Sequence, residues 1–301
     1  MTSGYSPAAR FAALLLMAGL AVAGCSRSAA PAGEAPAAPA EKRYPLRAEI
    51  IATKPEEGIL VAHHEEIPNY MPEMTMEFRV SKADAQNAKP GQRIRGEMYE
   101  KNGEAYLEKI WPDDTTVTGQ LDASVKALAQ DTAIRGKEVY REVGEAAPEF
   151  TLLDQEGRPV AMSRFRGRKV MLNFIFTRCP IATMCPASTQ RMSDLQQAAK
   201  AAGVTGLEFI SITLDPEYDT PGVLKEYAAV RGLDTSNWSF LTGPDAAVRH
   251  LLAQLGVIRE FTGNTINHTL ATLLINEQGK IIHRVDGSRW DNQEFLPKIQ
   301  R

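Results

Sequence analysis

The sequence lacks three features that would each have fixed a class of protein. It has only three cysteines in 301 residues, too few for a small disulfide-built scaffold. It has no excess of one charge, because 34 basic residues face 37 acidic ones, so no basic field is available to bind nucleic acid. Beyond residue 24 it has no run of about 18 apolar residues, so the rest is not expected to span a membrane. What remains is a chain that is 44% apolar and long enough for two ordinary domains.

The first 24 residues are typical of a secretory signal. Phe11–Ala23 is an apolar run of 13 residues after Arg10, too short for a bilayer span but suited to a signal-peptide core. Small residues then lead to Cys25, and this segment resembles a bacterial lipobox, in which the cysteine is lipidated and becomes the mature N-terminus. The alternative is an ordinary cleaved signal with a chance cysteine. We expect a lipid-anchored protein on the periplasmic side of a bacterial membrane, where disulfides can form.

Residues 25–43 are expected to form a tether. Ser26–Glu41 is rich in alanine and proline and offers almost nothing to pack into a core. At about 3.1 Å per residue, a polyproline-like stretch of this length would reach roughly 50 Å. The folded part would therefore stand off the membrane while staying near it.

Residues 44–118 are predicted to form a small all-β domain. Five short segments are rich in β-forming residues and are separated by turn sequences, of which Asn102-Gly103 is the strongest hairpin signal. The predicted strands are Tyr44–Ala52, Ile59–His64, Met74–Val80, Arg93–Tyr99 and Ala105–Trp111. Five short strands in about 70 residues indicate a barrel of OB type.

Residues 119–143 are predicted to be a helical linker outside any core, because polar residues surround their few apolar ones. Residues 144–301 alternate strands and helices and end in a hairpin, which indicates an α/β domain of thioredoxin-like type. The predicted strands are Lys169–Phe176, Leu207–Thr213, Thr269–Ile275 and Lys280–Val285, and the predicted helices are Ser188–Ala202, Pro221–Val230, Pro244–Leu255 and Asp291–Ile299.

The predicted barrel carries a set of soft ligands. Met74 and Met76 are two residues apart, so on a strand both point to one face. Met71 lies three residues earlier, and His64 ends the preceding strand. Thioethers with one imidazole are poor ligands for hard cations and good ones for Cu(I). Two methionines on a strand are also common core filler, so the pattern alone leaves both interpretations open.

The context favours the metal site. The pattern His…Met-Pro-x-Met-Thr-Met-x-Phe resembles the CusF-like family of periplasmic copper-binding barrels. The resemblance implies that Met74 and Met76 are thioether ligands and His64 is the imidazole ligand, with His63 the competing candidate. Met71 stands where well-known members have a tryptophan that covers the metal. Either Met71 is a further ligand or the site is more open.

Two cysteines of the second domain lie at a strand-to-helix turn. Cys179 and Cys185 follow the strand ending at Phe176 and precede a helix, with five residues between them. A helix N-terminus favours the thiolate, which is both the nucleophile and the ligand form. The plain alternative is a structural disulfide. Thioredoxins place a cis-proline opposite their dithiol, and here that place holds His268. Two thiolates and one imidazole would make a three-coordinate soft site suited to copper.

Several motifs of this domain resemble the Sco/SenC family of copper proteins. They are Ala147–Phe150, Phe176–Pro180, Leu214–Pro221 and Asn267–Thr269, together with the region of Trp238. The resemblance implies a thioredoxin-like fold and copper held by two cysteines and a histidine. It also implies that the protein helps to load the binuclear copper centre of cytochrome c oxidase. Some members act instead as thiol–disulfide reductants on the cysteines of that centre.

The resemblance assigns Cys179, Cys185 and His268 as copper ligands. It matches Asp219 to a family acid near the site, which would tune the thiolates without binding the metal. One departure is the five residues between the cysteines, because members usually have three. A longer loop can still close around a metal, but redox potential and affinity cannot be carried over.

The sequence therefore predicts a lipid-anchored copper chaperone with Cu(I) in the barrel and Cu(I) or Cu(II) in the second domain. Its expected partner is a copper-centre subunit of cytochrome c oxidase or another periplasmic copper protein. A thiol–disulfide oxidoreductase with Cys179 as the attacking thiol is the enzymatic alternative, and peroxidase activity is a weaker variant of it. A copper buffer for resistance is the third interpretation.

Overall fold

The protein is described by a computed structural model, which covers residues 42–136, 139–262 and 265–301. The predicted signal of residues 1–24, the lipidation candidate Cys25 and most of the tether lie outside the described residues. Among the helices that are described, none combines the length and the apolar character that crossing a bilayer requires.

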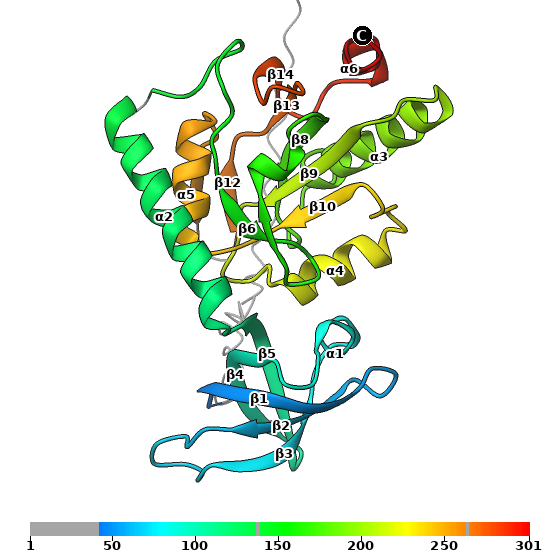
Figure 1. Cartoon of the computed structure of the whole chain (residues 1–301). Coiled ribbons are helices and arrows are strands. Elements are labelled where there is room, and N and C mark those ends of the chain that lie inside the picture. The colour runs from blue at the N-terminus through cyan, green and yellow to red at the C-terminus, as the bar shows by residue number, and fades with distance from the viewer. Residues whose placement is uncertain (1–41, 137–138, 263–264) are drawn as a thin grey trace, which may run out of the picture. The chain divides into compact units, whose positions relative to one another are not determined.

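The first folded region is the predicted barrel (Figure 1). Its strands are β1 (Tyr44–Lys54), β2 (Ile59–His64), β3 (Met74–Arg79), β4 (Arg93–Lys101) and β5 (Glu104–Pro112). They close in the order β1-β2-β3-β5-β4, with β3 and β5 parallel and the other pairs antiparallel. Asn102 and Gly103 both have positive φ, at 54° and 79°, and join β4 to β5 as the hairpin signal predicts. The predicted OB-type barrel is confirmed.

The barrel is closed around side chains that alternate along its strands. In β2 the inward-facing residues Leu60, Ala62 and His64 are buried, while the residues between them are partly exposed. This alternation puts His64 among the apolar side chains of the barrel. A short helix that the sequence did not predict, α1 (Lys82–Asn87), follows β3 and is capped by Ser81, whose side chain accepts from the backbone N–H of Asp84.

The second folded region is built on a five-stranded sheet with the order β10-β9-β8-β13-β14. Strands β8, β9 and β10 are parallel, and β13 runs antiparallel to β8 and to β14. The strands are β8 (Lys169–Ile175), β9 (Leu207–Thr213), β10 (Trp238–Leu241), β13 (Ala271–Ile275) and β14 (Ile281–Asp286). The predicted thioredoxin-like α/β fold is confirmed. The central strand β8 is buried along almost its whole length, which explains its unbroken apolar sequence.

Helices cover this sheet, and several short elements complete the domain. The helices are α3 (Cys185–Ala201), α4 (Pro221–Val230), α5 (Asp245–Gln254) and α6 (Asn292–Ile299). The short elements are the pair β6 (Thr151–Leu153) and β7 (Pro159–Ala161), the 3-10 turn η1 (Met162–Phe165), and the pair β11 (Arg259–Thr262) and β12 (Thr265–His268). The sequence predicted neither of these strand pairs, nor β10, because each has only three or four residues.

The predicted linker is part of the second core. Helix α2 (Thr115–Arg135) begins earlier and ends earlier than predicted, and it lies alongside α5 (Figure 1). Leu128 is buried in the main apolar cluster of the second region. The Gln254 side chain donates to the Leu128 carbonyl at 3.1 Å. The prediction of a helix outside any core was therefore wrong, because its few apolar residues find a partner in α5.

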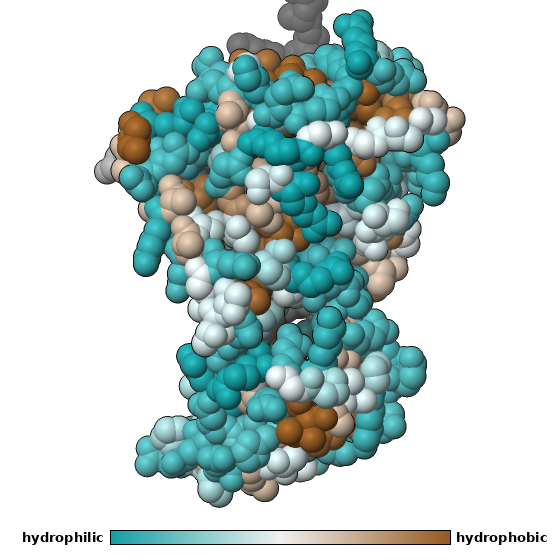
Figure 2. Space-filling model, viewed as in Figure 1, coloured by the Kyte–Doolittle hydropathy of each residue, from teal (hydrophilic) through white to brown (hydrophobic). Residues whose placement is uncertain are grey.

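Figure 2 shows a face on which hydrophilic residues predominate and hydrophobic ones form small separate areas. The buried apolar side chains lie mainly in two clusters, one inside the barrel and one around the sheet of the second region. The loop between β8 and α3 and the end of β12 are held at the edge of the second cluster, where the predicted site lies.

Candidate metal centre

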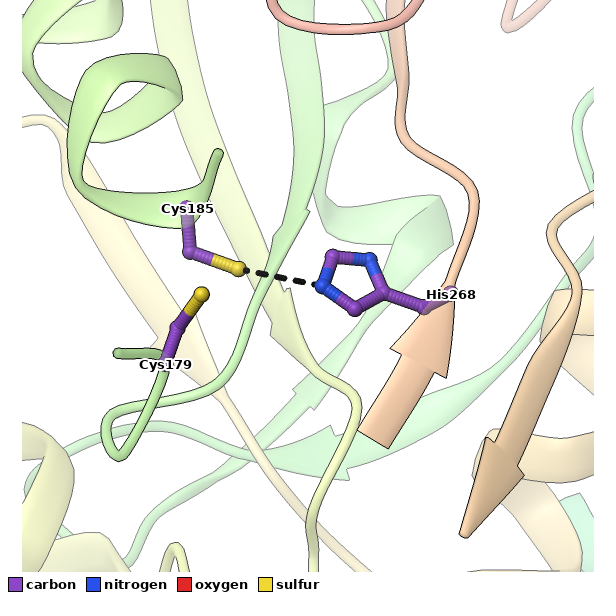
Figure 3. Close-up of side chains that lie close together, drawn as sticks. All are labelled: Cys179, Cys185 and His268. Atoms are coloured by element: carbon purple, nitrogen blue, oxygen red, sulfur yellow. Dashed lines mark hydrogen bonds between the residues drawn. The ribbon is translucent and has the colours of Figure 1, made fainter. Parts of the chain in front are cut away.

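Three residues from distant parts of the sequence converge in the second region. Cys179 lies in the loop after β8, Cys185 is the first residue of α3, and His268 ends β12. Their ligand atoms all lie within 4.8 Å of one another. Figure 3 shows both sulfurs turned toward the imidazole, with the Cys185 Sγ 3.7 Å from His268 Nε2. Both cysteines are free thiols. The structure thus brings together the three residues that the sequence proposed.

The hydrogen bonds of His268 set its tautomer. Nδ1 lies 3.1 Å from the backbone carbonyl of Thr269, which can only accept, so Nδ1 carries the proton. Nε2 then carries a lone pair and faces the Cys185 Sγ. A ring whose other nitrogen is fixed by a carbonyl is the usual arrangement of a metal-binding histidine. The Phe176 ring packs edge-on against the imidazole at 5.4 Å and limits its rotation.

The two thiols differ in electrostatics. The hydrogen bond from Cys185 lowers the pKa of Cys179 from 9.0 to about 5, helped by a backbone N–H of Cys185 itself. The same hydrogen bond, together with burial, raises the pKa of Cys185. Cys179 is partly exposed, whereas Cys185 is fully buried. Near neutral pH the pair therefore holds one thiolate on the accessible sulfur and one thiol on the buried sulfur.

This arrangement suits a soft metal ion. A thiolate-bound ion lies about 2.3 Å from sulfur, so three ligands in a plane around it stand about 4 Å apart. The observed separations need little adjustment to reach that geometry. Two sulfurs and one imidazole nitrogen match the preference of copper rather than of calcium or magnesium. A metal would also take the place of the shared proton, because both sulfurs bind as thiolates.

Asp219 lies behind the cysteine loop. It is buried, and its carboxylate accepts from the Thr177 backbone N–H at 3.1 Å and from the hydroxyls of Thr177 and Thr213. Burial raises the pKa of Asp219 to about 6, although these hydrogen bonds oppose the shift. Asp219 does not belong to the group of candidate ligands. It holds the segment that carries Cys179, in keeping with the indirect role that the resemblance implies.

An ion pair that the sequence did not predict fixes Arg178, the residue directly before Cys179. Arg178 donates to Asp215 at 2.6 Å and stacks over the Tyr218 ring at 4.1 Å. The Asp215 carboxylate raises the pKa of Arg178 through that hydrogen bond. The signal was present, because Arg178 adjoins Cys179 and Asp215 lies in the same motif as Asp219. No local sequence pattern indicated that Arg178 and Asp215 would form an ion pair.

The barrel brings two of its predicted ligands face to face. His64 of β2 pairs directly with Met74 of β3, and Met76, two residues further, pairs with Ala62. Partners in an antiparallel pair point to the same face, so both thioethers lie on the side of the imidazole. Met74 is 42% exposed, whereas His64 is 0% exposed. The site would therefore sit at an open end of the barrel.

The two neighbouring histidines have opposite surroundings. His64 Nδ1 lies 2.7 Å from the Glu65 carbonyl, and its Nε2 is buried with no hydrogen-bond partner. Few buried polar atoms lack a hydrogen-bond partner, and a nitrogen that binds a metal would be one of them. His63 is partly exposed on the other face, and both of its nitrogens are bonded, to Thr75 at 3.0 Å and to Glu73 at 2.9 Å. The geometry favours His64 as ligand.

Met71 lies in the loop that returns to β3. Its backbone exchanges hydrogen bonds with Ile67, at 3.0 and 2.9 Å. Its side chain is partly buried against the barrel core, as is that of Met76. Tyr70, its neighbour, stacks on Tyr44 at 3.9 Å. Met71 is thus held beside the barrel core rather than free in a loop.

Two family models match the chain. One, described as SCO1/SenC, matches residues 138–301, just over half of the chain. The other, described as the copper binding periplasmic protein CusF, matches residues 43–112.

Individual proteins resemble the second region. The SCO1 protein homolog of Bacillus subtilis (strain 168) is 30% identical over 162 residues, which cover 52% of this chain and 81% of the relative. The crystal structure of a SCO1/SenC family lipoprotein from Bacillus anthracis str. Ames is 25% identical, with a TM-score of 0.48, and covers 54% of this chain and 98% of that one. The structure of Bradyrhizobium japonicum ScoI with copper bound is also 25% identical, with a TM-score of 0.45, and covers 52% and 99%.

Proposed function

Because the chain belongs to the SCO1/SenC family, we propose that it is a copper chaperone, anchored by lipid at Cys25 on the periplasmic side of a bacterial membrane. The observation that carries this proposal is the convergence of Cys179, Cys185 and His268, with their ligand atoms within 4.8 Å. Copper is its cargo, held long enough to be delivered and released without a chemical reaction on the protein.

In the second domain the two cysteines and His268 hold the ion. Cys179 supplies a thiolate already present at neutral pH, and Cys185 gives up its proton as the ion binds. His268 supplies Nε2, which faces the sulfurs while Nδ1 donates to the Thr269 carbonyl. Asp219 holds the Cys179 segment in place through Thr177.

In the barrel His64, Met74 and Met76 hold Cu(I), with Met71 as a further ligand on the loop. None of the thioethers has a proton to lose, so copper binding by them displaces no thiol proton. Family resemblance and the unpartnered His64 Nε2 support the assignment.

Delivery proceeds by ligand exchange with a copper-centre subunit of cytochrome c oxidase. Cys179 is the accessible ligand of the second site, whereas Cys185 is buried. Ligands of an acceptor can therefore bind the ion on the side of Cys179 before the bond to Cys185 breaks. The tether would let the folded domains reach a membrane-bound acceptor.

One observation favours a second function, reduction of disulfides in partner proteins. The lowered pKa of Cys179 makes it the attacking thiol, and Cys185 lies near enough to resolve the mixed disulfide. In that step Cys179 attacks the partner disulfide, Cys185 then attacks Cys179, and the partner leaves as a dithiol while this pair becomes a disulfide.

Copper titration of the purified protein tests the main proposal. Cys179→Ala should remove copper from the second domain, and Met74→Ala should weaken binding in the barrel. Undiminished copper in both variants would reject the ligand assignment. Oxidase activity of a deletion strain at low copper then separates delivery from buffering, because a buffer leaves that activity unchanged. Strong turnover of a disulfide substrate by the metal-free protein would favour the reductase.

A further inference from the structure

An open cavity of about 470 Å³ adjoins the second metal site. His268, the ligand at the end of β12, lines one side of it. Met184, in the cysteine loop, lines it as well. Among the described residues that line this cavity, Met184 is the one that carries sulfur. The cavity is therefore bordered by one proposed ligand of the candidate site and by an unassigned soft donor.

The backbone around Met184 is held in place. Its N–H donates to the Ile181 carbonyl at 3.0 Å, and its carbonyl accepts from the Ser188 N–H at 2.8 Å. The hydroxyl of Ser288, which also lines the cavity, donates to the Thr183 carbonyl at 2.6 Å. Met184 directly precedes Cys185, so its position is fixed together with that of the buried ligand.

The surroundings of Met184 differ from those of the domain's other methionines. Met162, Met171 and Met192 are fully buried in the apolar core, where methionine acts as filler. Met184 is only partly buried and packs at the edge of the core, as Cys179 does. Met184 thus lines the same cavity as the candidate ligand His268, whereas the other three methionines serve the core alone.

We propose that the Met184 thioether is a fourth copper ligand, reaching the ion from the cavity side and completing a set of two thiolates, one imidazole and one thioether. This inference rests on the proposed copper function. A thioether is a neutral, weak and long-bonded ligand, and in blue-copper sites such a ligand tunes the potential. Met184 would thus be the weakest of the four ligands and the first to leave the ion when acceptor ligands bind it.

The test uses selenomethionine-labelled full-length protein in which Met71, Met74 and Met76 are replaced by leucine, so that the barrel thioethers are absent. X-ray absorption at the selenium and copper edges then reports which atoms neighbour copper in the second domain. We expect a copper–selenium contact, together with copper–sulfur contacts from the cysteines. Met184→Leu, a volume-conserving change, should remove the selenium contact and keep the sulfur contacts. The matched control Met192→Leu should change neither.

Affinity supplies a second measurement. In competition with a Cu(I) chelator, Met184→Leu should weaken the second site by about tenfold, equivalent to about 1.4 kcal/mol, and Met192→Leu should not. Copper–sulfur contacts without a selenium contact in the parent protein would overturn this inference and leave the proposed function standing. Absence of both contacts would overturn the proposed function itself.

Discussion

The two candidate sites solve the same chemical problem in different ways. The barrel draws its donors from two adjacent strands and a short loop, with His64 directly opposite Met74. The second site joins Cys185 to His268, which are 83 residues apart in sequence. The barrel site depends on a local β-hairpin, whereas the second exists only when β8, α3 and β12 are all in place.

The sites also differ in charge. The barrel offers neutral thioethers and one imidazole, so a bound Cu(I) keeps its positive charge there. The second site offers two sulfurs that bind as thiolates, so their negative charge more than offsets that of Cu(I), and the Cys185 thiol must first lose its proton. Cu(I) should therefore be held more tightly in the second site, and more tightly still as pH rises. These differences between the two sites can be tested by removing the ligands of one site at a time.

The largest expected effect follows from Cys185→Ser. Loss of the buried thiolate should weaken copper binding in the second domain by more than about a hundredfold, since even residues that only support a ligand account for 10–100-fold. Copper content of the full chain by atomic absorption, after dialysis against a weak chelator, gives the measurement. The barrel copper should remain, and its simultaneous loss would show that the sites are not independent.

His64→Ala should produce the reverse pattern. The barrel should lose roughly a hundredfold in Cu(I) affinity because it loses its imidazole, while the second domain keeps its copper. His63→Ala is the matched control, since His63 faces outward and is bonded to Thr75 and Glu73. If His63→Ala lowers the affinity and His64→Ala does not, the assignment of the ligand is reversed.

A smaller effect concerns the reactivity of Cys179. Its pKa of about 5 means that the thiolate is present above that pH and is lost as pH falls through it. Alkylation of the metal-free protein by iodoacetamide, followed by mass spectrometry, should therefore titrate near pH 5. In Cys185→Ala the hydrogen bond is gone, the midpoint should move toward 9, and the rate at pH 6 should fall by at least about tenfold. If the alkylation of Cys179 has the same midpoint in both proteins, Cys185 does not lower the pKa of Cys179.

The smallest effect is on stability. Asp219→Asn removes one acceptor from the group that holds Thr177 and Thr213, and should lower the free energy of unfolding by about 1–2 kcal/mol in urea at pH 7. Glu217→Gln is an exposed change in the same loop and should have almost no effect. If Asp219→Asn leaves both stability and Cys179 alkylation unchanged, Asp219 has no part in holding the loop.

Much of this architecture could be predicted because its signals are local. The Asn102-Gly103 hairpin and the alternation in β2 follow from residues within a few positions of one another. The predicted barrel ligands came from the resemblance to the CusF-like family, and the spacing of Met74 and Met76 puts both on one face of β3. The start of α3 was predicted three residues late, at Ser188 rather than at Cys185. Pro186 is tolerated in a first helical turn, and this places Cys185 at the helix N-terminus.

The remaining features depend on contacts between distant residues. Burial of Leu128 requires α5, and the ion pair of Arg178 requires the loop after β9. The sequence predicted Cys179 and His268 as ligands, but the distance between their side chains depends on where β12 ends relative to β8. Whether they bind copper remains a prediction, as does the role of Met71.

The most direct test of the two-site account is the stoichiometry of Cu(I) bound to the full-length protein under anaerobic conditions, measured with competing chelators of graded strength. The account predicts two ions per chain, bound in separate steps, with the tighter step strengthening from pH 6 to pH 8 while the weaker step changes little. A single ion, or two steps with the same pH dependence, would contradict it.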